Sequence, residues 1–147
     1  MQHTTTATLY VRTPAPMATE KRQETILGRL EALRRSGAID EVTVTYWFRQ
    51  ARVDDADPVM PSVIALEEWA SANDVELTPA FDRHDRANWY TGAADSVVSL
   101  PVICLAVFSD GEICGVYPHV GPSGHQSVVD GLDSLEAETM AKRYPST

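Results

Sequence analysis

The stretch that decides the fold is Glu41-Val42-Thr43-Val44-Thr45-Tyr46-Trp47-Phe48. Its residues are mostly β-branched or aromatic, and they alternate between two distinct sets, which is the two-residue period of a strand. Just before it, apolar residues recur at helical spacing between Ile26 and Leu33, until Ser36-Gly37 provides a helix stop. The chain therefore passes from a first helix, which we expect Thr19 to cap, directly into a strand.

The rest of the sequence extends this alternation of strands and helices. A second amphipathic helix is expected to close near Asn73-Asp74, and Asp110-Gly111 predicts a tight hairpin turn. Ser127, with Asp130 at the third helical position, predicts the cap of a last helix. The other expected segments are a strand at 8–12, a loop at 50–61, an extended segment at 75–81, an irregular insertion at 82–99 with room for an extra short strand, a nearly continuous buried strand at 97–108, a strand at 112–117, a loop at 118–124 and a frayed tail at 142–147.

Length and composition describe one globular domain. A chain of 147 residues with 44% hydrophobic residues is long enough to bury a core and too short for two ordinary domains. No apolar run approaches the roughly 18 residues that span a bilayer, and the N-terminus does not look like a secretory signal. We therefore expect a cytoplasmic protein without membrane contact.

The charge balance is unusual. Against 21 Asp and Glu residues stand 12 Lys and Arg residues, of which only Lys21 and Lys142 are lysines, and the net charge is -9. Such a surface repels itself in dilute buffer, whereas in molar salt the Debye length shrinks to ~3 Å and the repulsion is screened. The composition therefore resembles that of proteins from extremely halophilic archaea, with an ordinary acidic cytosolic protein as the alternative. Acidity usually argues against nucleic acid, but molar salt weakens the electrostatic contribution for every protein.

The order of elements, with Leu100-Pro101-Val102 before the buried strand, resembles the thioredoxin-like fold. The resemblance implies an α/β protein with a three-layer α/β/α arrangement around a mixed central sheet, forming a single domain over residues 1–147. It also implies a cis bond before Pro101, with an ordinary trans bond as the open alternative. Redox members of that fold carry Cys-x-x-Cys at the start of the first helix. Residues 13–19 contain no cysteine, so dithiol exchange is not expected there.

The two cysteines are not expected to replace that pair. With Asp110-Gly111 as a two-residue turn, the predicted pairs are Phe108 with Ile113, Val107 with Cys114, and Cys104 with Tyr117. Cys104 and Cys114 then lie on opposite faces of the sheet, where their sulfurs cannot bond. We expect both to be small buried apolar residues.

A second resemblance covers the whole chain. The stretches Leu9-Tyr10-Val11-Arg12, Gly37-Ala38-Ile39-Asp40 and Leu132-Asp133-Ser134-Leu135-Glu136 are similar to a family of short haloarchaeal proteins labelled as helix-turn-helix domain proteins. That resemblance implies DNA binding and transcriptional control. A helix-turn-helix needs a second helix after a turn of three or four residues, whereas here the strand pattern at 42–46 follows. The residue pattern therefore disagrees with the label.

The residues that could act in catalysis or metal binding form no complete motif. The histidines lack the spacing of compact zinc sites and are expected to be exposed in loops: His84, His119 and His125. Ser123 has no nucleophile elbow around it. The charged cluster at 82–86 is interpreted as side chains that screen one another. We expect no catalytic residue, no metal and no cofactor.

These observations favour a binding or regulatory module over an enzyme. The alternative is a DNA-binding regulator of the helix-turn-helix type, and a third reading is an enzyme that uses His119 or His125. Under the first reading the ligand site lies where a thioredoxin-like fold leaves backbone groups unpaired beside a helix N-terminus, at Thr13, Thr19, Leu100 and Pro101. The expected partner is a protein or a small molecule, or DNA under the alternative. Its identity and the oligomeric state stay open, a homo-oligomer included.

Overall fold

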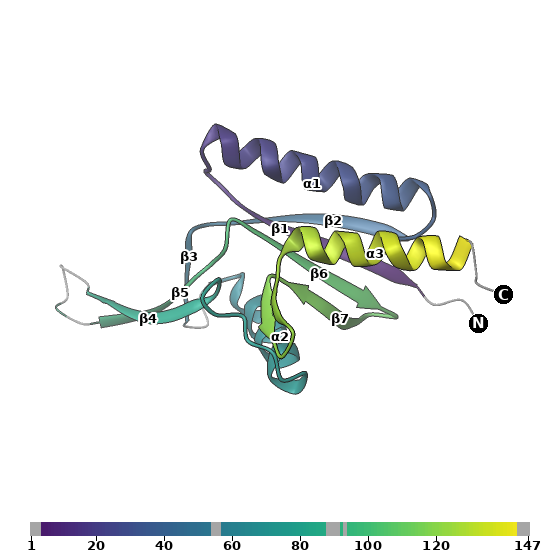
Figure 1. The fold of residues 1–147 in the computed structure, drawn as a ribbon. Coiled ribbons are helices and arrows are strands. Elements are labelled where there is room, and N and C mark those ends of the chain that lie inside the picture. Colours follow the sequence, from purple (N-terminus) through teal and green to yellow (C-terminus); the bar gives the residue numbers. More distant parts are fainter. Residues whose placement is uncertain (1–3, 54–56, 88–91, 93, 144–147) are drawn as a thin grey trace.

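The computed structural model describes residues 4–53, 57–87, 92 and 94–143, which form three helices and nine strands (Figure 1). The helices are α1 (Met17–Arg35), α2 (Met60–Ala72) and α3 (Val128–Arg143). The strands are β1 (Thr5–Arg12), β2 (Glu41–Trp47), β3 (Gln50–Arg52), β4 (Asp82–Ala87), β5 (Ala94–Ser99), β6 (Ile103–Ser109), β7 (Glu112–Tyr117), β8 (His119–Gly121) and β9 (Gly124–Gln126). The predicted passage from the first helix into a strand is confirmed, because α1 leads directly into β2.

The main sheet has four strands in the order β2-β1-β6-β7. β1 pairs in parallel with β2 and antiparallel with β6, and β6 pairs antiparallel with β7. The sheet is therefore mixed, and the predicted α/β class is confirmed.

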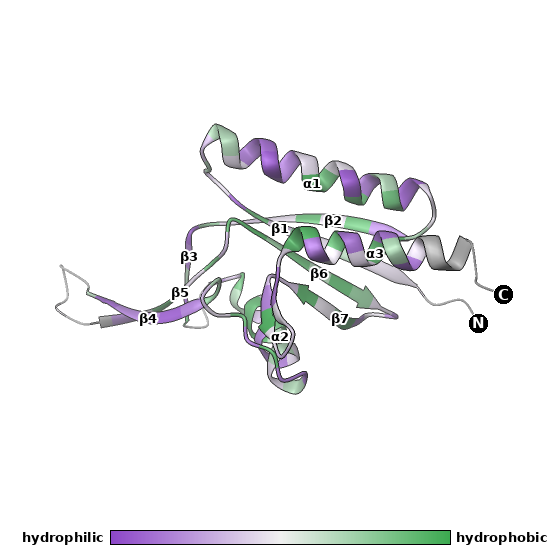
Figure 2. Cartoon of the chain, in the orientation of Figure 1, coloured by the Kyte–Doolittle hydropathy of each residue, from purple (hydrophilic) through white to green (hydrophobic). Residues whose placement is uncertain are grey.

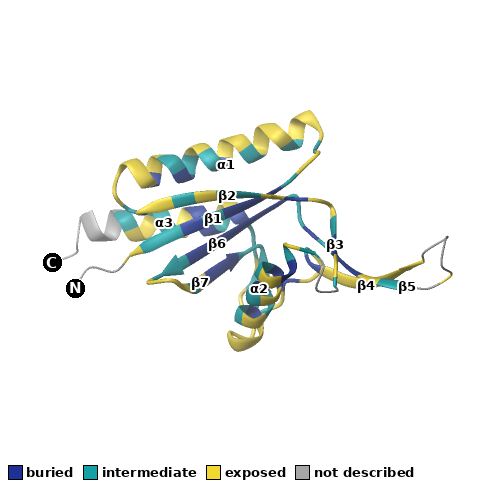
Figure 3. Cartoon of the chain, turned by 180° about the vertical axis from the view of Figure 1, so that it is seen from behind, coloured by how far each residue is buried: buried dark blue, intermediate teal, exposed yellow. Residues whose placement is uncertain are grey.

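Helices cover both faces of this sheet (Figure 3). On one face, α1 and α3 bury apolar side chains such as Leu30 and Leu132 against Leu9 and Leu105. On the other face, α2 contributes Leu66 and its neighbours to a second cluster. Because β6 is buried on both sides, it consists almost entirely of apolar residues, and Figure 2 shows it as one of the greenest segments.

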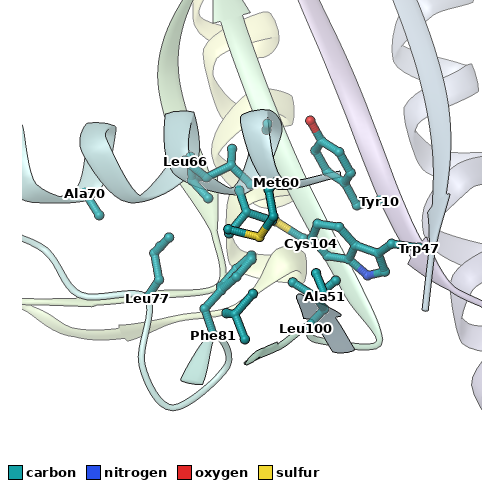
Figure 4. Close-up of a cluster of buried hydrophobic side chains, with 14 residues drawn as sticks. Tyr10, Trp47, Ala51, Met60, Leu66, Ala70, Leu77, Phe81, Leu100 and Cys104 are labelled. Carbon is teal, nitrogen blue, oxygen red and sulfur yellow. The ribbon is translucent and has the colours of Figure 1, made fainter. Parts of the chain in front are cut away.

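The second cluster joins the main sheet to α2 and to a smaller sheet. Trp47 is 2% exposed and stacks on Tyr10 with ring centroids 4.7 Å apart, while Phe81 meets its edge at 5.7 Å (Figure 4). Leu100 and Ala51 close this cluster from the side of the smaller sheet.

The smaller sheet, which we call the arm, has the strand order β3-β5-β4. It extends away from the main sheet and beyond the helices in both views of the whole molecule (Figures 1 and 3). A third sheet is the two-stranded hairpin of β8 and β9, and Val120 forms an isolated bridge with Glu76. The loop predicted at 118–124 therefore contains β8 and the first residue of β9, and the extended segment predicted at 75–81 forms only that one bridge.

The arm corrects two predictions. The segment 82–99, predicted to be an irregular insertion, contains the paired strands β4 and β5. The apolar run 97–108, predicted to be one strand, is divided between β5 in the arm and β6 in the main sheet. Leu100-Pro101-Val102 separates them, since a proline cannot donate to a ladder. The Leu100–Pro101 bond is trans, whereas three other X-Pro bonds in the described residues are cis: Thr13-Pro14, Thr78-Pro79 and Tyr117-Pro118.

The predicted helix ends agree with the structure at some positions and not at others. α1 ends where predicted, with Gly37 at a φ of 85° after it, and the Ser127–Asp130 cap of α3 is confirmed. The cap of α1 is wrong: Pro16 occupies the N-cap position, and Thr19 lies inside the first turn. The tail predicted to fray from 142 is helical through Arg143, and residues 144–147 lie outside the described part of the chain.

The β6–β7 hairpin forms at the predicted turn but contains a bulge. Phe108 pairs with Ile113 as expected, whereas Val107 pairs with Gly115, and the register shifts between Val107 and Phe108. The extra residue is Cys114, which is exposed and not buried as predicted. Cys104 is buried on the α2 side, both cysteines are free, and the expected absence of a disulfide between them is confirmed.

Candidate functional site

Strand β4 of the arm carries unusually polar side chains. All six side chains of β4 are exposed, and Figure 2 colours this strand as strongly hydrophilic. β4 pairs over its whole length with β5, so Asp82 lies opposite Ser99 and Ala87 opposite Ala94. The sequence of β4 is almost entirely charged, and its strand conformation follows from this pairing rather than from an amphipathic pattern.

The two faces of the arm differ in chemistry. One face packs toward α2: Ala51 and Val98 enter the core, and Arg83 Nε donates to Glu67 Oε2 at 3.0 Å. The other face carries polar and charged side chains from paired positions, since residues directly opposite share a face. They are Gln50, Arg52, Asp82, His84, Arg86, Asp95 and Ser99, and the buried Val97 lies among them, opposite Arg52 and His84.

Side chains on this polar face bond to one another. Arg86 Nη1 donates to Gln50 Oε1 at 3.2 Å, and Gln50 Nε2 lies 3.3 Å from His84 Nε2. The prediction that His84 is exposed is confirmed, although it lies on a strand and not in a loop. The arm therefore offers a solvent-facing surface on which an arginine, a histidine and an amide are held in one row.

The arm base, by which we mean Arg12, Arg49 and Leu100, joins the arm to the main sheet. Arg12 Nη2 donates to the carbonyl of Leu100, and the Leu100 amide donates to the carbonyl of Arg49 at 2.9 Å. Arg12 ends β1, and Arg49 follows the end of β2. Because these strands are parallel, both arginines lie at the same edge of the main sheet.

The Arg12 guanidinium lacks partners for its charge and for one of its N–H groups among the described residues. Its Nε is buried and has no hydrogen-bond partner among the residues that the structure describes. Burial lowers the pKa of Arg12 from its ordinary value, and the nearby positive charge of Arg49 lowers it further. Within the described residues, neither arginine forms an ion pair, although the whole chain carries a net charge of -9.

The predicted ligand residues lie around this base, but their backbone groups are mostly occupied. The Thr13 amide donates to the Trp47 carbonyl at 2.9 Å, and the Pro101 carbonyl accepts the Trp47 indole Nε1 at 3.0 Å. Leu100 is fully buried, with both backbone groups bonded. Thr19 lies one turn into α1 and makes none of these contacts. The expected row of unpaired amides and carbonyls is therefore not present at Thr13, Leu100 and Pro101.

A groove of about 300 Å³ runs beside Thr13, between α1 and the strands β1 and β2. Leu9, Val44 and Leu27 contribute apolar walls, and Gln23 bridges its end by donating to the carbonyls of Arg12 and Val102, at 3.2 and 2.8 Å. The groove adjoins one of the four predicted ligand residues, Thr13, but not the other three.

The remaining histidines lie on the β8–β9 hairpin. His119 Nδ1 contacts the Val116 carbonyl at 2.6 Å, and its ring lies between Trp69 and Tyr117, so it is half-buried and not exposed as predicted. His125 is exposed, as predicted, but on β9. Both line a small, mainly apolar hollow of about 220 Å³. Among its described lining residues, Thr78 carries the one other polar side chain. This hollow therefore offers His119 and His125 no charged partner for catalysis.

Sequence reasoning missed Arg12 and Arg49 because no motif links them. The sequence does contain a signal for this pair. Each arginine stands at or just after the end of a predicted strand. The two strands are connected through a helix, and such a crossover connection makes them parallel. Because parallel strands end at the same edge of a sheet, this pattern predicts that Arg12 and Arg49 lie near each other.

Comparison with known proteins gives one match. A family model described as "Helix-turn-helix domain" matches residues 1–140. No curated protein and no solved structure matches the chain. In the part of the chain that the structure describes, strands follow both α1 and α2, so no short turn joins two helices. None of the described helices combines the length and apolar character needed to cross a lipid bilayer.

Proposed function

Because the chain belongs to the helix-turn-helix domain family, we propose that the protein binds DNA, as a regulator and not as an enzyme. Family membership favours this function over the ligand-binding module that the residues first suggested. The contact surface cannot be a helix pair of the usual kind, since the described helices are separated by strands. Another element must therefore reach the duplex.

The observation that supports the proposal is the outer strand β4, whose six side chains are all exposed and which pairs antiparallel with β5. The major groove of B-DNA, about 12 Å wide, admits either a helix or a two-stranded ribbon, and several DNA-binding proteins use strands in this way. β4 exposes every side chain, and its arginine and histidine stand on the face turned away from α2. Arginine pairs in a bidentate manner with guanine or with phosphate, which suits this placement.

The charge of the arm also supports this role. On β3, β4 and β5, three arginines stand against three aspartates, whereas the remainder of the chain carries twice as many acidic as basic residues. A polyanion is repelled least where the acidic excess vanishes. The arm is accordingly the part of the surface best suited to approach DNA.

The test compares an arm variant with a matched control. Arg52→Gln with Arg86→Gln removes two arginines from the polar face, and we expect DNA affinity to fall about tenfold or more, given ~1–3 kcal/mol per arginine contact. Arg34→Gln removes one exposed arginine of α1 and is expected to leave the affinity unchanged. Fluorescence anisotropy with random-sequence duplex, measured from dilute to molar KCl, gives the affinities. The absence of binding by the unaltered protein across that whole range would refute the proposal.

We also propose, for the finer architecture, a thioredoxin-like arrangement without redox chemistry. The support is the element order, the mixed sheet and the placement of α1 and α3 on one face with α2 on the other. A small-molecule site at Thr13, Thr19, Leu100 and Pro101 remains the competing function, and the groove beside Thr13 favours it. Thr13→Val with Thr19→Val separates the two functions, because it leaves DNA affinity unchanged if the arm is the contact surface.

A further inference from the structure

Two arginines lie at the arm base and form no ion pair with the described part of the chain. Arg12 is held in place through its Nη2 bond to Leu100, and Leu100 is itself bonded to the backbone of Arg49. The chain thus brings together two residues that are distant in sequence, and it does so through a residue that is fully buried. The position of the pair is set by the core and not by a flexible loop.

The pair is electrostatically unfavourable as it stands. An N–H that is buried without an acceptor is destabilising, and Arg12 Nε is such a group among the described residues. The lowered pKa of Arg12 reflects burial first and the nearby positive charge of Arg49 second. Other arginines of the chain have carboxylate partners, namely Arg29, Arg34 and Arg83. A protein so rich in carboxylates has nevertheless placed none on Arg12 or Arg49 within the described residues.

We propose that Arg12 and Arg49 together bind a phosphoryl group. A tetrahedral oxyanion offers acceptors to several N–H groups at once, and guanidinium groups bind phosphate in a bidentate manner. It would satisfy the free donor of Arg12 and neutralise the repulsion between the two cations.

The source of the phosphoryl group depends on the function. If the protein binds DNA through the arm, as proposed above, the group is a backbone phosphate, because the arm base adjoins the arm: Arg49 directly precedes β3 and Leu100 directly follows β5. Contacts of this kind fix the register of a protein on the duplex without reading sequence. If the protein does not bind DNA, the group belongs to a free phosphorylated molecule. The two sources share one chemistry and are distinguished by experiment.

The experiment uses inorganic phosphate and duplex DNA as separate probes of the full chain. The Arg12 Nε–H resonance is followed by ¹H–¹⁵N NMR while phosphate replaces chloride at constant ionic strength. We expect a saturable shift, with the apparent affinity for phosphate at least tenfold weaker in Arg49→Gln. Arg49 is exposed and its side chain makes no hydrogen bond or ion pair in the described residues, so this variant is expected to fold normally. Arg12→Lys, which keeps the charge but loses the planar fork, provides a second variant, and Arg34→Gln serves as the control.

DNA titrations of the same variants complete the test. If Arg49→Gln also weakens DNA binding equally for all sequences and lowers the salt slope by about 1, the group is a DNA phosphate. If phosphate binding is lost but DNA binding is unchanged, the site stands and serves a free phosphorylated molecule. If the unaltered protein binds phosphate but no DNA, the site stands while the proposed function falls. If phosphate leaves the Arg12 resonance unmoved and Arg49→Gln binds DNA normally, the site is refuted while the proposed function survives.

Discussion

Gly131 of α3 lies directly against the ring of Tyr117 on β7. A Cβ at Gly131 would be 2.6 Å from Cδ2 and 2.7 Å from Cγ of that ring. These atoms belong to the fixed end of the side chain, so the ring cannot swing away without moving the strand. We therefore expect Gly131→Ala to lower the free energy of unfolding: overpacking costs about 1–3 kcal/mol, and the better helix propensity of alanine recovers up to ~1 kcal/mol. Urea titration followed by circular dichroism measures the change.

Gly28 of α1 provides the matched control. It is also helical, but a Cβ added there would meet nothing within 4 Å. Gly28→Ala is expected to raise the free energy of unfolding by about 0.5–1 kcal/mol, because only the propensity gain operates. Equal effects of the two substitutions would contradict the packing of α3 on β7.

Trp47 is the largest side chain shared by the main sheet and the second cluster. Trp47→Phe removes the indole bond to the Pro101 carbonyl and leaves the space beside Tyr10 partly empty. We expect a loss of about 1–3 kcal/mol in the free energy of unfolding. Tyr46→Phe alters the neighbouring residue, which is 66% exposed, and should change stability by less than about 0.5 kcal/mol. Comparable losses in both variants would count against a buried Trp47.

The main sheet follows from the sequence because its signals are local. The alternation in residues 41–47, the Asp110-Gly111 turn and the Ser127–Asp130 cap each depend on residues a few positions apart. The arm does not follow in this way. Both faces of β4 are exposed, so no alternation marks it as a strand, and its partner β5 is joined in sequence to the apolar run of β6.

The candidate site depends on contacts that cross the whole chain. Leu100 links Arg12 to Arg49 through one side-chain bond and one backbone bond, and neither bond has a local signature. The predicted residues Thr13 and Pro101 came close to this place because the element order located the edge of the sheet. The backbone groups that this prediction takes to be free are bonded, and the unsatisfied donor among the described residues belongs to the Arg12 side chain. The ligand role of Thr13, Thr19, Leu100 and Pro101 stays a prediction.

Potassium chloride should stabilise the protein over an unusually wide range of salt concentration. The net charge of -9 and the scarcity of lysine motivate this expectation. Screening of repulsion between carboxylates raises the free energy of unfolding as the Debye length falls from ~10 Å at 0.1 M to ~3 Å at 1 M. Urea titrations at KCl concentrations from about 0.1 to 3 M measure the trend. A free energy that is flat or falls over this range would contradict the proposal that the chain is adapted to high salt.

The two cysteines should differ sharply in reactivity. Cys104 is fully buried, and burial raises the pKa of its thiol far above the ordinary value. Cys114 is exposed at the bulge, although partial burial and the charge of Glu138 raise its pKa as well. With iodoacetamide, we expect slow labelling of Cys114 that accelerates with rising pH, and labelling of Cys104 only after unfolding. Peptide mass spectrometry locates the label, and early modification of Cys104 would refute its burial.

Asp130 should make the stability of the protein depend on pH in the range where carboxyl groups titrate. Its Oδ2 accepts the Ser127 amide at 2.7 Å and the Ser127 hydroxyl at 3.0 Å, and the backbone bond chiefly lowers its pKa below the ordinary value of 3.8. A carboxylate whose pKa is lower in the folded state stabilises the protein fully above the unfolded pKa. That contribution is lost as pH falls toward the folded pKa.

The difference in unfolding free energy between the unaltered protein and Asp130→Asn isolates this contribution from the other carboxylates. We expect the difference to be constant at neutral pH and to shrink as pH falls below about 4, because protonation then removes from the aspartate the charge that asparagine never had. Urea titrations at pH values from about 7 down to 3 measure it, in KCl high enough to keep both proteins folded. Asp133→Asn, on an exposed carboxylate of the same helix that pairs with Arg29, separates loss of the cap from a general loss of charge on α3. A difference for Asp130→Asn that did not change with pH would mean that the carboxylate does not cap α3 in its charged form.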